Sequence, residues 1–154
     1  MEAVVSEVMT GYGKFGAAAA IAFAAMGSAL GTGAAGSSVI GVWKKCFAQS
    51  KTAPFILMTF VGAPLSQTIY GMILMNNILE ASVANPALWP AMIAAGVFGG
   101  AAMGLSSWAQ GKAGAGAADA LAETGKGFGN YLMVLGVVET VALFVMVFVA
   151  NTLR

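Results

Sequence analysis

The chain has 154 residues, of which 59% are hydrophobic and 8% charged, with 21 glycines and no histidine. An ordinary soluble domain has about 25% charged residues, so this composition predicts a membrane protein, and the length fits one domain over residues 1–154. The lack of histidine excludes Ser-His and Cys-His catalytic pairs, and the single Cys46 excludes an internal disulfide. A net charge of +1 provides no attractive field for nucleic acid.

The seven basic and six acidic residues leave four long runs with no charge or one. The runs cover residues 15–43, 52–79, 81–111 and 127–153, and the last contains Glu139 as its one charged residue. Each run exceeds the roughly 20 apolar residues that cross the hydrocarbon core of a bilayer. The fold class is therefore predicted to be an all-α membrane protein, with transmembrane helices at about 12–43, 52–79, 90–122 and 127–153.

The connections between these helices are short and polar, at residues 44–51, 80–90 and 123–127. Five lysines lie on the side of the first and third connections, whereas the opposite side has two basic residues, Lys14 and Arg154. Basic residues gather on the cytoplasmic side of membrane proteins. We therefore expect a multi-pass protein of the cell membrane with both termini outside the cytoplasm.

Glycine and alanine are concentrated in the first and third predicted helices, whereas the second and fourth are rich in Leu, Met, Val and Phe. Small residues four apart, such as Gly27 with Gly31 and Gly96 with Gly100, allow helix backbones to approach closely in lipid. The first and third helices are thus expected to form a crowded layer. The alternation also indicates a duplicated hairpin, with halves at about 1–80 and 81–154, in which Gln67 corresponds to Glu139.

Glu139 lies near the middle of the fourth run, where an ionised group would cost at least about 2.5–3.5 kcal/mol. Gln110 and Glu139 are symmetric about position 124.5, in the connection at 123–127, and Gln67 and Gln110 are symmetric about position 88.5, inside the loop at 85–90. Antiparallel helices therefore place the three side chains at one depth. This position marks Glu139 as the principal candidate functional residue.

The second predicted helix adds a stripe of oxygen-bearing groups at this depth. Ala63, Ser66, Gln67 and Tyr70 have the spacing of one helical face, and Pro64 frees a backbone carbonyl one turn earlier. Oxygen ligands with one carboxylate suit a hard cation, and a single negative charge neutralises a monovalent one. The residues thus favour sodium, lithium or a proton.

Simpler roles remain open for the individual members of this group. Gln67 and Gln110 could brace neighbouring helices, Ser66 could bond to its own helix, and Tyr70 could be an interfacial aromatic residue. Lys112 fits least well, since it falls inside the third helix, where it would reach toward an interface along its aliphatic stem.

Four short sequences in the predicted helices occur together in one known family. They are Gly-Ser-Ala-Leu-Gly at 27–31, Pro-Leu-Ser-Gln at 64–67 with Tyr-Gly at 70–71, Ala-Gln-Gly-Lys at 109–112, and Val-Glu-Thr at 138–140. With them the chain resembles the proteolipid (K or c) subunit of V-type rotary ATPases in its duplicated four-helix form. The resemblance implies a homo-oligomeric ring with the first and third helices inside, and it is closer to the sodium-translocating members.

The resemblance also implies roles for individual residues. It implies that a sodium ion is held by Glu139, Gln67, Gln110, Ser66 and the backbone carbonyl of Ala63, and that Tyr70, with Thr140 as a further neighbour, closes the site by hydrogen bonds. Leucine is usual in the sodium-type members where Ala63 stands, so the seal on the lipid side differs here.

As a rotor subunit the chain would contain no catalytic residues and no organic cofactor, and its cargo would be Na⁺ or H⁺. ATP would be hydrolysed in other subunits, since the sequence has no Gly-Lys-Ser/Thr phosphate-binding loop. The implied partners are further copies of the chain, a static membrane subunit with an essential cation, central-stalk subunits at the cytoplasmic loops, and the lipid bilayer.

Two other classes compete with a rotor subunit. A small four-helix cation or drug antiporter would also use one membrane glutamate, but members of the small multidrug family carry it in the first helix. A pore would need polar residues along a whole helix stripe, whereas here they lie at one level. A large ring on purification would favour the rotor, and a dimer the antiporter.

Overall fold

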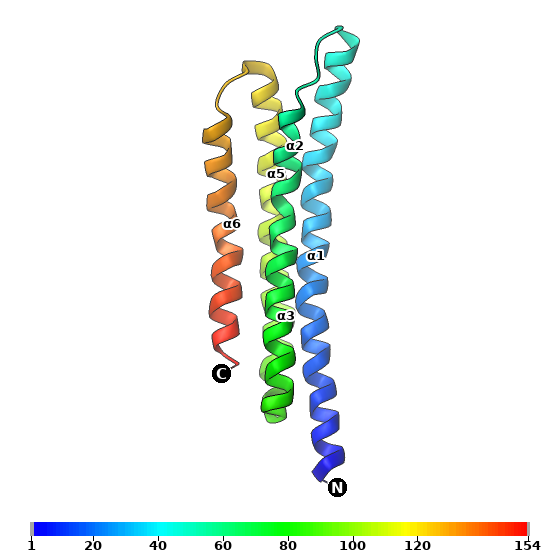
Figure 1. Cartoon of the computed structure of the whole chain (residues 1–154), viewed down its shortest axis with the longest axis vertical. Coiled ribbons are helices and arrows are strands. Elements are labelled where there is room, and N and C mark those ends of the chain that lie inside the picture. The colour runs from blue at the N-terminus through cyan, green and yellow to red at the C-terminus, as the bar shows by residue number, and fades with distance from the viewer. Residues whose placement is uncertain (1, 154) are drawn as a thin grey trace.

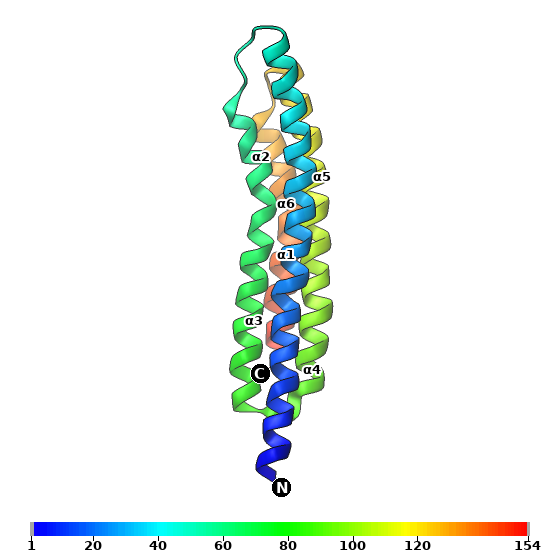
Figure 2. The same ribbon diagram turned by 90° about the vertical axis from the view of Figure 1, so that its right-hand side faces the viewer.

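In a computed structural model, which describes residues 2–153, the chain forms an elongated bundle of four antiparallel helical segments (Figures 1 and 2). The first is α1 (Glu2–Ala48), and the second joins α2 (Met58–Gly62) to α3 (Ser66–Ala84). The third joins α4 (Trp89–Ala94) to α5 (Gly100–Thr124), and the fourth is α6 (Phe128–Asn151). All four segments are long and apolar enough to cross a membrane, which confirms the predicted fold class.

Helices α3 and α5 lie between α1 and α6 (Figure 1). Helix α1 packs along α5 and α3, and α6 packs along the other sides of the same two helices. Of the four spans, α6 is the least buried within the chain. Helices α3 and α5 therefore contact both outer helices, and side chains from both converge on the middle of the bundle.

The helices extend farther than predicted at two of the three connections. Helix α1 continues through Ala48, so the region 44–51 is mostly helical, and α3 continues to Ala84, so the region 80–90 narrows to Asn85 and one 3₁₀ turn. The predicted ends at 43 and 79 are too early, because charged residues mark the end of a membrane span but do not end a helix. Asn85 is extended (φ −144°, ψ 77°) because the following Pro86 disfavours the helical conformation there.

The third connection agrees with the prediction at 123–127. Helix α5 ends at Thr124, and the chain turns through Gly125 (φ 64°) and Gly127 (φ 86°). These left-handed conformations are strained for residues with a side chain, so the two glycines fix the tight turn into α6.

Two irregular turns interrupt the helices that follow these connections. Ala63–Leu65 forms a 3₁₀ turn around Pro64, between α2 and α3, and Ala95–Gly99 forms a π-helical turn between α4 and α5. A π turn adds one residue to the local repeat and rotates the helix beyond it. The hydropathy pattern did not indicate the π turn, because the span remains apolar on both sides of it.

Glycines form the contact between α1 and α5, as the small-residue spacing predicted. A methyl group on Gly16, Gly27 or Gly31 would overlap the backbone of α4 or α5, and one on Gly111 would overlap Gly31. The first and third helices are therefore in backbone contact, which lets α5 approach the bundle axis more closely than any larger residue would allow.

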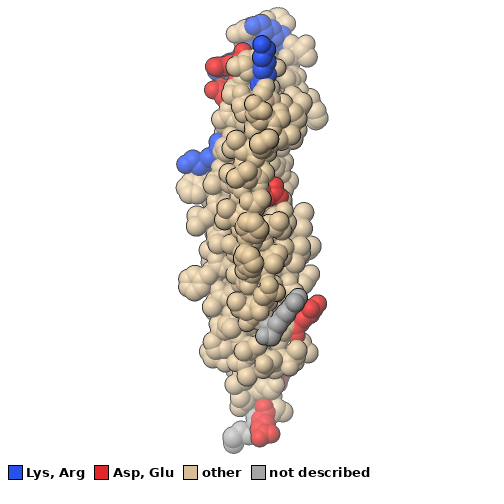
Figure 3. All heavy atoms as spheres, turned by 90° about the vertical axis from the view of Figure 1, so that its left-hand side faces the viewer, with Lys and Arg blue, Asp and Glu red and all other residues tan. Residues whose placement is uncertain are grey.

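Charged side chains gather toward the two ends of the bundle and leave a broad uncharged band between them (Figure 3). One acidic group lies at mid-height in this band, and Glu139 is the one charged residue of α6. The start of α1 and the end of α6 lie at the same end of the bundle (Figure 1). Of the two basic residues expected there, Arg154 lies outside the described residues.

Replacing Gly31 by alanine should destabilise the protein by about 1–3 kcal/mol, because the added methyl group meets the Ser107 carbonyl and the Pro64 ring. Gly33, two residues along the same helix, has open space at that position, so Gly33→Ala should be neutral or stabilising by about 0.5–1 kcal/mol. Thermal unfolding of both variants in detergent measures the difference. Equal melting temperatures would contradict the proposed backbone contact.

Candidate functional site

Glu139 is half-buried on α6 and receives one hydrogen bond at each carboxylate oxygen. The phenol of Tyr70 on α3 donates to Oε1 at 2.8 Å, and Nε2 of Gln110 on α5 donates to Oε2 at 3.3 Å. Groups from three helices therefore meet at the one charged residue of the fourth span.

Gln110 is fully buried and connects α6 to α3. Its Nε2 also donates to the backbone carbonyl of Leu135 at 3.0 Å, and its Oε1 accepts a hydrogen bond of 2.8 Å from Nε2 of Gln67, which is fully buried too. Gln67, Gln110 and Glu139 thus form one hydrogen-bonded chain. The expectation that these three residues lie at one depth agrees with this contact.

Three oxygen atoms lie close together where the second span passes into α3, those of the Ser66 hydroxyl, the Ala63 carbonyl and the Gln67 amide. The Ser66 hydroxyl lies 3.2 Å from the Ala63 carbonyl oxygen and 3.2 Å from Oε1 of Gln67. A hydroxyl has one hydrogen, so it cannot donate fully to both acceptors. Three neutral oxygens in this arrangement, close to a carboxylate, are the kind of ligands that a hard monovalent cation takes.

Pro64 explains why this turn departs from a regular helix. Proline has no N–H to donate to the carbonyl of Phe60, and the chain tightens into a 3₁₀ turn over Ala63–Leu65. A methyl group added at Gly114 of α5 would lie 2.9 Å from the Phe60 carbonyl oxygen. The glycine thus lets α5 lie directly against the part of the second span that Pro64 loosens.

Two of the residues considered in the sequence lie apart from this cluster. Thr140 is exposed, and its hydroxyl donates to the carbonyl of Val137 in its own helix at 2.7 Å. This bond replaces the expected bond from Thr140 to the site. Lys112 is exposed on α5 with Nζ 5.0 Å from the centre of the Trp108 ring. This distance is within the range of a cation–π contact, which the sequence had not indicated.

Sequence reasoning missed four hydroxyl groups that surround the cluster, those of Ser28, Thr68, Ser106 and Ser107. Ser106 and Ser107 bond to carbonyls of α6 and of the second span respectively. The position of Ser106 and Ser107 one turn before Gln110 could have indicated that they lie next to the cluster. Throughout the described residues, every buried side-chain nitrogen or oxygen has at least one hydrogen-bond partner within the protein.

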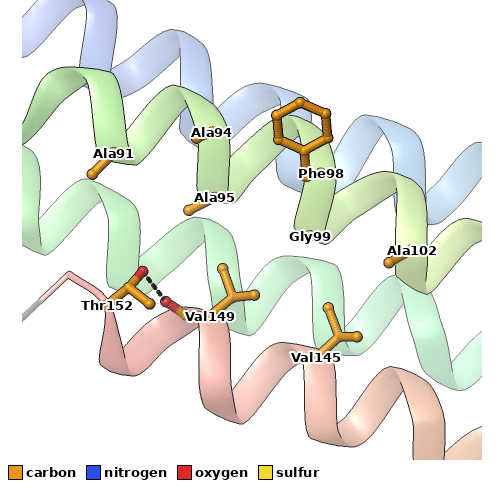
Figure 4. A pocket seen from close by; sticks show the side chains of 9 residues that line it. All are labelled: Ala91, Ala94, Ala95, Phe98, Gly99, Ala102, Val145, Val149 and Thr152. Carbon is orange, nitrogen blue, oxygen red and sulfur yellow. Dashed lines mark hydrogen bonds between the residues drawn. The ribbon is translucent and has the colours of Figure 1, made fainter.

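An apolar groove of about 410 Å³ lies between α4–α5 and the end of α6 (Figure 4). It is lined mainly by alanines and valines, and the hydroxyl of Thr152 at its edge is bonded to the carbonyl of Val149 at 2.7 Å. The groove therefore offers no free polar group to an ion. Among the described residues, the polar side chains of Gln67, Gln110 and Glu139 lie together in a separate cluster.

Replacing Gln110 by leucine should destabilise the protein by about 1–3 kcal/mol, because it leaves buried partners on α3 and α6 without a hydrogen bond. Asn77 on α3 provides the control, since its amide bonds to the Ile73 carbonyl of its own helix at 3.0 Å. Asn77→Leu should shift the melting temperature in detergent much less. A comparable loss in both variants would show that Gln110 does not join the helices.

Comparison with models of protein families gives a match over part of the chain. Residues 93–150, which contain α5 with Gln110 and all but the last residue of α6, match the family of the C subunit of ATP synthase. The search of curated proteins gave no match. Proteins of this family are non-catalytic rotor subunits that carry H⁺ or Na⁺ and form oligomeric membrane rings. With its four apolar helices, the chain is a multi-pass membrane protein whose second hairpin is similar to the C subunit of ATP synthase.

Proposed function

We propose that this chain is an ion-carrying rotor-ring subunit of a V-type ATPase, and that it carries Na⁺ at Glu139. The observation that carries the proposal is the single carboxylate of α6, which meets Tyr70 and Gln110 at hydrogen-bond distance in the middle of an apolar span. The match of residues 93–150 to the C subunit of ATP synthase supports the same role.

The mechanism follows from the free energy of an unpaired charge in lipid. Ionised Glu139 facing hydrocarbon would cost several kcal/mol, at least about 2.5–3.5 on insertion scales, whereas Glu139 paired with one monovalent cation is neutral. The loaded site can therefore turn through the bilayer. Release requires water and a competing cation, which a static membrane subunit would supply, and ATP hydrolysis in other subunits would drive the rotation.

Neutral oxygens beside the carboxylate favour sodium over a proton as the cargo, because a sodium ion needs several oxygen ligands and a proton needs only one. A proton requires only the carboxylate, and the two donors from Tyr70 and Gln110 already satisfy that group. The Ser66 hydroxyl, the Gln67 amide oxygen and the Ala63 carbonyl form a further group of neutral oxygens. These atoms, with the second lone pair of Gln110 Oε1, complete the proposed Na⁺ ligands, and a proton-carrying rotor is the second candidate.

The packing of the helices supports the proposed duplication. In the alignment of the halves 1–80 and 81–154, Gly31 corresponds to Gly111 and Gly16 to Gly96, and in both pairs the two glycines contact each other. A duplicated hairpin whose halves are related by a local two-fold axis brings equivalent positions of the two repeats into contact in this way.

We propose that the cytoplasmic side is the end with the connections 49–54 and 125–127. These connections would contact a central stalk, and both termini would lie outside the cytoplasm.

Carbodiimide, which reacts with a protonated carboxyl group, should label Glu139, and millimolar sodium should slow the labelling at about pH 6 to 8, because cation and proton compete for the same oxygens. Mass spectrometry of the purified protein locates and times the modification. Glu139→Gln should abolish labelling at this position, and Glu80, exposed at the end of α3, serves as the internal control. Labelling of Glu139 at an unchanged rate in sodium would leave the proton-carrying rotor.

The native mass of the purified protein separates a rotor from an antiporter. A ring of many copies is expected, because the chain exposes large apolar side chains along most of its length and the proposed repeat would place α1 and α5 on one side. Native mass spectrometry in mild detergent measures the number of copies. A stable dimer would contradict the rotor proposal in both its sodium and its proton form.

A further inference from the structure

Two adjacent serines of α5 bond to the backbones of two different helices next to the proposed site. The Ser106 hydroxyl donates to the carbonyl of Val138, the residue before Glu139, at 2.9 Å. The Ser107 hydroxyl donates to the carbonyl of Pro64 at 2.6 Å. One peptide unit of α5 thus connects the carboxylate-bearing helix to the turn that carries Ser66 and Gln67.

The bond from Ser107 is the end of a chain of hydroxyl groups in the bundle core. Thr68 donates to Ser28 at 2.8 Å, and the hydroxyl oxygens of Ser28 and Ser107 are 3.2 Å apart. Because the one hydrogen of Ser107 points to Pro64, Ser28 is the donor between the two serines. The chain therefore begins at Thr68 and ends at Pro64, at the two ends of the turn that holds the neutral oxygens.

These bonds differ from the usual behaviour of serine in a membrane helix. A helical serine commonly donates to the carbonyl one turn earlier in its own helix, as Thr32 does in α1 with Ser28. Ser106 and Ser107 donate instead to neighbouring helices, and both are buried, at 6% and 0% exposure. In an apolar core such hydroxyls lose their bond if the helices separate or rotate, so they hold the two sides of the site in register.

We infer that Ser106 and Ser107 are positioning residues that set the distance between the Glu139 carboxylate and the oxygens of the Pro64–Thr68 turn. Neither needs to touch the ion. Gln110, one turn further along α5, then meets both Gln67 and Glu139 with its single amide group. The inference rests on the proposed role of this cluster as the ion site.

The test compares Ser106→Ala and Ser107→Ala with Ser38→Ala. Ser38 provides a matched control, because its hydroxyl also donates between helices, from α1 to the Ala115 carbonyl of α5 at 2.9 Å. It lies about 15 Å along α1 from Ser28 at about 1.5 Å per residue. The readout is the pH profile of carbodiimide labelling at Glu139 in the purified oligomer, first without sodium and then with increasing sodium.

Both site variants should move the pH of half-maximal labelling upward, because misplaced donors from Gln110 and Tyr70 stabilise the ionised carboxylate less. The sodium concentration for half-protection should rise by about fivefold to tenfold, the effect of one misaligned hydrogen bond. Ser38→Ala should change neither quantity, although all three variants lower the melting temperature. Profiles of Ser106→Ala and Ser107→Ala that coincide with those of Ser38→Ala would overturn the inference.

Thr68 gives a second pair of variants, of which Thr68→Val keeps the size of the side chain. Thr68→Val removes the donor to Ser28 but keeps the bond from Ser107 to Pro64, so it should shift the profile in the same direction as Ser107→Ala but by less, whereas Thr68→Ser keeps the hydroxyl and should keep the wild-type profile. If the wild-type protein shows no sodium protection, the proposed Na⁺ cargo is wrong, while the profiles without sodium still decide the role of the serines.

Discussion

The backbone contact between α1 and α5 is the constraint on which the rest of the structure depends. Only residues without a side chain allow two helices to approach this closely in a bilayer, where lipid chains are as apolar as the helices and association relies on close packing. Gly27 and Gly31 of α1 and Gly111 of α5 meet this requirement. Once α5 is held against α1, its other faces remain free to contact α3 and α6, which makes α5 the helix from which the polar cluster is organised.

The polar cluster in turn resolves the conflict between a carboxylate and its apolar surroundings. Glu139 lies in a helix with no other charged residue, and the free energy of an ionised group there is acceptable only with donors or a counter-ion nearby. Tyr70 and Gln110 supply the donors, and Ser66, Gln67 and Ala63 supply neutral oxygens beside them. A group that is stable when neutralised and unstable when bare is suited to pick up and release a cation at defined places.

The depth of the site could be predicted from the sequence because helix rise is constant. Counting residues from the two connections placed Gln67, Gln110 and Glu139 at one level, and the hydrogen bonds between them agree. The first two helices end at Ala48 and Ala84, about five residues later than predicted. Polar residues mark the edge of a membrane and not the end of hydrogen bonding within a helix. Thr140 was expected near the site, but its hydroxyl bonds within its own helix, a local choice that spacing does not decide.

The sequence by itself determined that this is a four-span membrane protein with one mid-membrane carboxylate, because composition and the positions of thirteen charges, seven basic and six acidic, are one-dimensional facts. It also indicated which residues share a depth and which helices can pack closely. Only the tertiary structure decided how the helices are rotated, since the π turn at Ala95–Gly99 changes the face that α5 presents. The structure also places Ser106 against α6 and Ser107 against the turn at Pro64, a relation between distant segments that no periodicity along the chain contains.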